Sequence, residues 1–102
     1  MLSINKKITL EFLGEEYADS YVNMSAIPLK DYDEMVKQSE AVKDDNKKAM
    51  EYMVKLVQDR FQSGSIKQGD DMVDMSKEDI SDMPGEFFLN VIRKLSGQDP
   101  NA

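Results

Sequence analysis

The apolar residues between Asp45 and Ser63 repeat with a helical period, the clearest in the chain. One stripe follows the spacing i, i+3, i+4, i+7, i+11, and a second stripe lies beside it. Together they cover roughly 200° of the helix circumference, against about 100° for an ordinary surface helix. The pattern predicts one long central helix with Asp44 or Asp45 as its N-cap and Gly64 at its C′ position. The first stripe is Met50, Met53, Val54, Val57 and Phe61, and the second is Ala49, Tyr52 and Leu56.

Near the N-terminus, apolar and polar residues alternate in the segment KITLEFL from Lys7 to Leu13. This period of two predicts a half-buried β-strand. Gly14-Glu15 suits a tight type II′ turn, and a second strand from Tyr17 to Ile27 would complete a β-hairpin. Two strands alone are marginally stable, so we expect the hairpin to pack on helices or to pair with another chain.

Between this hairpin and the long helix, the spacing of Leu29, Tyr32 and Met35 predicts a short amphipathic helix from about Leu29 to Gln38. Residues 39–44 either continue it or form a polar connection. After Gly64 the period is lost, and residues 65–75 predict a loop or a small hairpin.

The C-terminal region carries helix start and stop signals. Ser76 and Asp79 form a capping-box-like S-x-x-D that opens a one-turn helix. Pro84 then starts the last helix, and Gly97 stands where a C′ glycine belongs. The apolar face of this last helix consists of Phe87, Phe88, Val91, Ile92 and Leu95.

These elements predict an α+β protein that is mostly helical. An N-terminal β-hairpin is followed by three or four helices, one of them long and central. The length of 102 residues suits one small domain, which we place over residues 1–97, with a polar tail over 98–102.

Composition narrows the function. The chain has 20 acidic and 13 basic side chains, for a net charge of −7. Residues 63–102 hold eight of the acidic side chains and four of the basic ones. This balance argues against binding to a phosphate backbone, and the aromatic residues are not interleaved with a basic patch. We therefore expect no nucleic-acid partner.

Catalytic and metal-binding patterns are missing as well. The chain has no His and no Cys, which excludes Ser-His-Asp or Cys-His catalysis and Cys-based zinc sites. Its glycines are scattered and form no phosphate-binding loop. The triplet Asp70, Asp71 and Asp74 fails the EF-hand pattern, because Met72 and Met75 occupy loop positions that need an oxygen ligand and a glycine. We expect neither an enzyme nor a bound metal or cofactor.

The sequence also contains no apolar run near the ~20 residues that span a bilayer, and its start lacks the apolar core of a signal peptide. We expect no membrane partner and a soluble protein that stays inside the cell.

A family resemblance involves the C-terminal part of the chain. Phe61 and Gly64 are followed by the polar stretch 65–75, the acidic turn Asp79-Ile80-Ser81-Asp82-Met83-Pro84 and the ending Leu95-Ser96-Gly97. This order resembles the C-terminal half of tail assembly chaperones of long-tailed, siphovirus-type bacteriophages. The opening KITLEFLGEEY is similar to the short N-terminal hairpin of some members.

The resemblance implies a non-enzymatic protein in the cytoplasm of an infected or lysogenic bacterium, absent from the mature virion. Such chaperones bind the tape measure protein, keep it soluble and yield to the tail tube protein as the tube assembles. Many are also made in a longer form by a ribosomal frameshift. Small size favours repetition along a long client, so we also expect self-association.

Two faces are the candidates for binding a client or a second copy, although each residue on them also suits an ordinary core. They are Met50, Met53, Val54, Val57 and Phe61 on the long helix, and Phe87, Phe88, Val91, Ile92 and Leu95 on the last helix. Two alternative functions remain open: a structural tail-completion protein, and an acidic inhibitor or DNA mimic.

Overall fold

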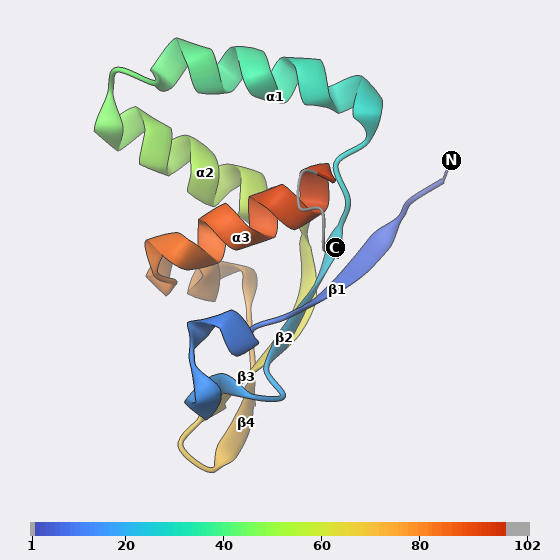
Figure 1. The fold of residues 1–102 in the computed structure, drawn as a ribbon, viewed down its shortest axis with the longest axis vertical. Helices are drawn as coiled ribbons and strands as arrows, with labels where there is room; N and C mark the ends of the chain where they lie inside the picture. Colours follow the sequence, from blue (N-terminus) through green and yellow to red (C-terminus); the bar gives the residue numbers. More distant parts are fainter. Residues whose placement is uncertain (1, 98–102) are drawn as a thin grey trace.

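The computed structural model describes residues 2–97, which form one antiparallel sheet and three α-helices (Figure 1). The predicted polar tail, 98–102, lies outside the described residues. The strands are β1 (Asn5–Thr9), β2 (Tyr21–Ser25), β3 (Phe61–Gln68) and β4 (Asp71–Asp74), in the sheet order β1-β2-β3-β4. The helices α1 (Leu29–Val42) and α2 (Asn46–Arg60) lie between β2 and β3, and α3 (Gly85–Ser96) follows β4.

The predicted fold, a mostly helical one with an N-terminal β-hairpin followed by three or four helices, is wrong, although the small hairpin that the sequence left open for residues 65–75 is present as part of β3 and β4. Half of the strands come after α2, and β3 pairs with both β2 and β4. The long helix ends at Arg60 rather than Ser63, and the chain passes directly into β3. The apolar pattern does not reveal that β3 belongs to the sheet, because its two buried positions are Gly64 and Ser65, which carry no hydrophobic signal.

Gly64 therefore does not cap a helix. It pairs with Val22 across the sheet. A Cβ atom at position 64 would lie 2.8 Å from the Tyr21 carbonyl oxygen and 3.0 Å from Val22 Cγ1. A glycine at this position lets β2 and β3 approach closely.

The connection between β1 and β2 also differs from the predicted tight turn. It contains two short 3-10 helices, η1 (Glu11–Leu13) and η2 (Glu15–Tyr17), which meet at Gly14. Gly14 has φ 132° and ψ 162°, a conformation that favours glycine. Both strands are consequently shorter than predicted.

Apart from Gly64, the predicted helix caps at Asp45, Ser76 and Gly97 are confirmed. The Asp45 side chain accepts a hydrogen bond from the Lys48 N–H at 3.1 Å. A third 3-10 helix, η3 (Lys77–Asp82), begins after Ser76, whose N–H donates to the Asp79 carboxylate at 2.7 Å. Gly97 ends α3 in the left-handed conformation, at φ 75°. Residues 39–42 continue α1, which settles the alternative left open by the sequence.

The buried apolar side chains form one cluster between the sheet and α3. Ile8, Val22 and Met24 face it from the sheet, while α2 adds only Val57 and α1 adds none. Figure 1 shows α3 lying across the sheet and the α1–α2 hairpin extending beyond one end of it. The remaining buried apolar residues are Leu10, Ile27, Met75, Ile80, Phe87, Phe88, Val91 and Leu95.

The C-terminal end of α3 is tied to the N-terminal part of the chain. The Lys6 ammonium group donates to the Lys94 carbonyl at 2.8 Å, and the Ile27 N–H donates to the Leu95 carbonyl at 2.9 Å. Carbonyls in the last turn of a helix lack i+4 partners; Ile27 supplies a donor to the Leu95 carbonyl, and Lys6 adds a second donor to the Lys94 carbonyl, which also accepts from the Gly97 N–H at 3.4 Å. The bonds from Lys6 and Ile27 hold α3 in place on the sheet.

Candidate functional site

Four of the five candidate residues on α3 belong to the core. Phe87, Phe88, Val91 and Leu95 are buried, and the two phenylalanine rings meet edge to face with centroids 5.3 Å apart. Ile92 is half-buried at the margin of the cluster. The buried face of α3 is therefore not a free surface for a client.

The five candidates that began as one stripe have different surroundings. Val57 is fully buried, whereas Met53 and Val54 are half-buried against the core. Phe61 is half-buried in β3, and Met50 is 58% exposed. The stripe thus runs from the core to solvent and does not act as one surface.

Two candidates, Met53 and Ile92, meet in an apolar groove of about 240 Å³ between the three α-helices. Leu89 also lines the groove and is 52% exposed, so the groove reaches solvent. The other lining residues are Met35 and Ser39 from α1, Tyr52 and Leu56 from α2, and Arg93 from α3. We call this set the three-helix groove.

Helical spacing explains how each helix contributes to the groove. On α2, Leu56 follows Tyr52 by four residues and Met53 by three, so the three side chains share one side of the helix. Leu89 and Ile92 form a similar i, i+3 pair on α3. Leu89 was not among the predicted residues, because it lies beside the main apolar stripe of α3. This i, i+3 spacing is the signal that could have found it.

Polar groups lie at the margins of the α1–α2 hairpin. Burial raises the pKa of the Tyr52 hydroxyl above its ordinary value, and the nearby Glu34 carboxylate adds to the increase. The phenol is therefore neutral at neutral pH and does not place a charge in the groove. Arg60, at the end of α2, donates to the Ala26 carbonyl at 3.2 Å and lies 3.5 Å from Asp31 of α1. These contacts fix the base of the hairpin.

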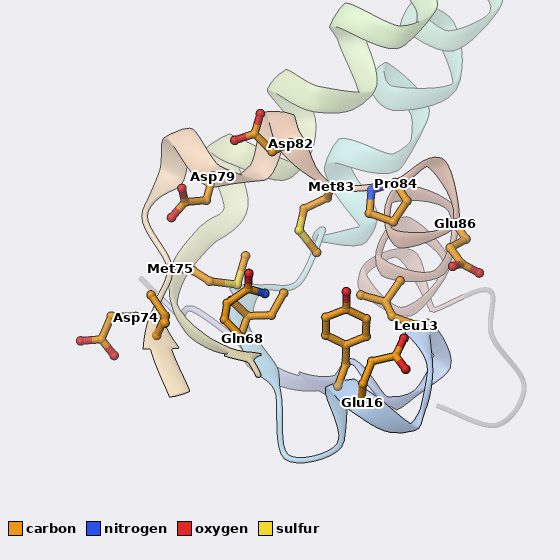
Figure 2. Close-up of a pocket in the computed structure, with 13 residues that line it drawn as sticks. Leu13, Glu16, Gln68, Asp74, Met75, Asp79, Asp82, Met83, Pro84 and Glu86 are labelled. Atoms are coloured by element: carbon orange, nitrogen blue, oxygen red, sulfur yellow. The ribbon is translucent and has the colours of Figure 1, made fainter. Parts of the chain in front are cut away.

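A second concavity, of about 520 Å³, lies between η2, the β3–β4 hairpin, η3 and the start of α3 (Figure 2). We call it the acidic-rimmed pocket. Its apolar lining is Leu13, Tyr17, Ile66, Val73, Met75, Met83 and Pro84, and its polar lining is Glu16, Gln68, Asp74, Asp79, Asp82 and Glu86. In Figure 2 the side chains of Met75 and Met83 point inward, while Asp74, Asp82 and Glu86 stand around the outside.

The acidic-rimmed pocket was not predicted from the sequence. The turn from Asp79 to Pro84 stood out as a motif, but the remaining lining comes from segments 13–17 and 66–75 and from Glu86 of α3. Only the pairing of β3 with β2 and β4 brings these segments together. No local pattern carries that signal.

Within residues 2–97, no group of three or more acidic, His or Cys side chains is arranged to hold a metal ion. None of the helices in the same range is long and apolar enough to cross a membrane.

Comparison of the chain with protein-family models, with curated proteins and with solved structures finds no match. A function must therefore be argued from the groove and the pocket themselves.

Proposed function

We propose that this protein is a non-enzymatic tail assembly chaperone of a long-tailed bacteriophage, and that its three-helix groove binds apolar helical segments of the tape measure protein. The observation that carries the proposal is the groove, an open apolar concavity between three helices. The family resemblance of residues 61–97 supplies the class of client.

The groove suits a helical client. Amphipathic helices bind partners by placing a few apolar anchors into a groove between helices. At about 240 Å³, the three-helix groove takes anchor side chains rather than a whole helix. Met35 and Met53 line it, and methionine is a flexible side chain that adapts to different anchors. A chaperone that covers a long client needs such tolerance.

The α1–α2 hairpin is also the part of the described structure best suited to yield. α1 has no buried side chain, and its exposed apolar residues include Leu29 and Val36. Segments with few buried apolar contacts open locally at low free-energy cost. Outward movement of α1 would widen the groove without disturbing the sheet or α3.

The rest of the proposal follows the same logic. A net charge of −7 keeps a protein with exposed apolar residues soluble. The proposed partners are the tape measure protein, the tail tube protein that displaces the chaperone, and further copies of the chain. The proposed location is the cytoplasm of an infected or lysogenic bacterium, with the protein left out of the mature virion. Neither nucleic acid nor membrane is a proposed partner.

Co-expression with the tape measure protein from the same genome tests the proposal. We expect the chain to raise the soluble fraction of that client and Leu89→Ser to remove most of the effect. Loss of one apolar anchor contact of about 1–2 kcal/mol weakens binding roughly 5- to 30-fold. Leu29→Ser is the matched control, because Leu29 is 88% exposed and does not line the groove.

An unchanged client solubility, or equal effects of the two serine variants, would contradict the groove proposal. Mass spectrometry of purified phage particles distinguishes a chaperone from the main alternative, because a structural tail-completion protein would be abundant in the virion. Inhibition of a nucleic-acid enzyme by the purified chain would instead favour the acidic inhibitor or DNA mimic.

A further inference from the structure

We propose that the acidic-rimmed pocket binds a basic protein segment, one in which Lys or Arg side chains flank a single apolar anchor. This second interaction surface goes beyond the proposed function. It shares no lining residue with the three-helix groove, and α3 is the one element that contributes to both, through Glu86 to the pocket and through Leu89, Ile92 and Arg93 to the groove.

The shape and floor of the pocket provide the anchor site. Its volume of about 520 Å³ lies within the ~300–1,000 Å³ typical of ligand pockets. Ile66, Met75 and Met83 belong to the lining, and Figure 2 shows both methionine side chains directed inward. Burying an apolar side chain against this floor removes it from water and favours binding through the hydrophobic effect.

The rim supplies the charge complementarity. Glu16, Asp74, Asp82 and Glu86 line the pocket, and none of them forms a salt bridge within residues 2–97. The fifth carboxylate, Asp79, accepts hydrogen bonds from the N–H and the hydroxyl of Ser76. No Lys or Arg lines the pocket. Four uncompensated carboxylates around an apolar floor favour cationic side chains on either side of an anchor.

The pocket is also accessible from the side of the sheet edge. β4 is an edge strand, and its four residues are exposed. Val73 and Asp74 of this strand belong to the lining. Within the described residues no further strand pairs with β4, so a segment can approach the pocket along this edge.

The first test measures fluorescence anisotropy with a labelled probe peptide, Lys-Arg-Lys-Leu-Lys-Arg-Lys. We expect saturable binding to the intact chain. Replacing the peptide's Leu by Ser should weaken it at least about fivefold, since the anchor is lost. Raising the salt concentration from about 0.1 M to about 1 M shortens the electrostatic screening length from about 10 Å to about 3 Å. This change should also weaken binding of the probe peptide strongly.

Matched variants locate the binding site. The pair Asp82→Asn with Glu86→Gln removes two rim charges and should weaken binding roughly three- to tenfold. The control pair Asp44→Asn with Glu51→Gln changes the net charge equally at exposed positions away from the pocket and should leave binding within about twofold.

The apolar floor of the pocket is tested with a matched pair of variants. Val73 and Met72 are neighbours on β4 and are both 45% exposed, but only Val73 lines the pocket. Val73→Ser should weaken binding of the probe peptide several-fold, and Met72→Ser should leave that binding unchanged. Thermal unfolding of each variant, measured alongside, identifies any that has lost its fold.

Three outcomes would overturn the proposal: equal binding of the Leu and Ser peptides, equal losses in the pocket and control variants, or loss of peptide binding in Leu89→Ser. The last outcome would move the peptide to the three-helix groove. The two proposals fail separately, because the pocket variants should leave the solubility of the tape measure protein unchanged.

Discussion

Helices α2 and α3 carry similar apolar stripes in the sequence but have different environments in the fold. α3 buries Phe87, Phe88, Val91 and Leu95, whereas α2 buries only Val57. The buried face of α3 belongs to one cluster with the buried side chains of the sheet. The wide apolar face of α2 is divided between the core, α1 and solvent. The width of an apolar face therefore does not indicate how much of it is buried.

The same difference in burial separates the two regions of the molecule to which these helices belong. The sheet and α3 form a closed core, and the α1–α2 hairpin is an open appendage that shares a groove with the outer side of α3. Stability should depend mainly on the first region. Client binding, as proposed, should depend on the second.

The largest contrast should come from core truncation. Phe87→Ala removes a buried ring and should lower the free energy of unfolding by about 3–5 kcal/mol. Met53→Ala removes a half-buried side chain on α2 and should cost about 1–2 kcal/mol. Urea denaturation measures both.

Because a domain of this size has a total stability of only about 5–15 kcal/mol, Phe87→Ala could leave too little folded protein to measure. Phe87→Leu, with an expected loss of about 1–2 kcal/mol, keeps the comparison measurable. Its partner is Met53→Leu, which nearly conserves volume and should cost less. Equal losses at the two positions would contradict the division into a closed and an open region.

A smaller effect should come from crowding the sheet at Gly64. Gly64→Ala places a Cβ against the Tyr21 carbonyl and should cost about 1–3 kcal/mol, measured by thermal unfolding. The control is Gly85→Ala at the start of α3, where an added Cβ meets no atom within 4 Å. This control should be neutral or stabilise by up to about 1 kcal/mol. If both changes were equally tolerated, the close approach of β2 and β3 would not be a requirement.

The smallest effect concerns the local interactions that hold the hairpin. Asp45→Ala removes the N-cap of α2 and should lower the free energy of unfolding by about 1 kcal/mol. Asp44→Ala, one residue earlier, removes a carboxylate that does not cap the helix and should have less effect. Chemical denaturation monitored by circular dichroism gives the free energy of unfolding of each variant. Equal losses in Asp45→Ala and Asp44→Ala would indicate a general charge effect.

Short-range signals predicted several helix boundaries, but not the C-terminal end of α2, which was expected at Ser63 and lies at Arg60. Asp45, Pro84 and Gly97 all lie at helix ends, because capping depends on residues within one turn of each other. The start of α1 at Leu29 follows Pro28 for the same local reason. The start of β3 at Phe61 and its pairing with β2 were not predicted, because its buried Gly64 and Ser65 reflect contact with β2 rather than an alternating apolar pattern.

The candidate site was predictable only in part. Met53 and Ile92 were selected and do line the three-helix groove, but Leu89 was not. Phe87 and Val91 were selected for the same apolar periodicity and are instead core. A stripe reports that a helix face is apolar, and it carries no information about the element that covers that face.

By itself, the sequence determined the helix caps, the amphipathic faces and the acidic balance, because each depends on residue type and on neighbours a few positions away. Only the tertiary structure decided that β3 completes a four-stranded sheet, that α3 is the core helix and that Leu89 faces a groove. Those outcomes depend on contacts between segments far apart in the chain, as between Val22 and Gly64 or between Ile27 and Leu95. Burial is a property of such pairs of segments, and no single stretch of sequence encodes it.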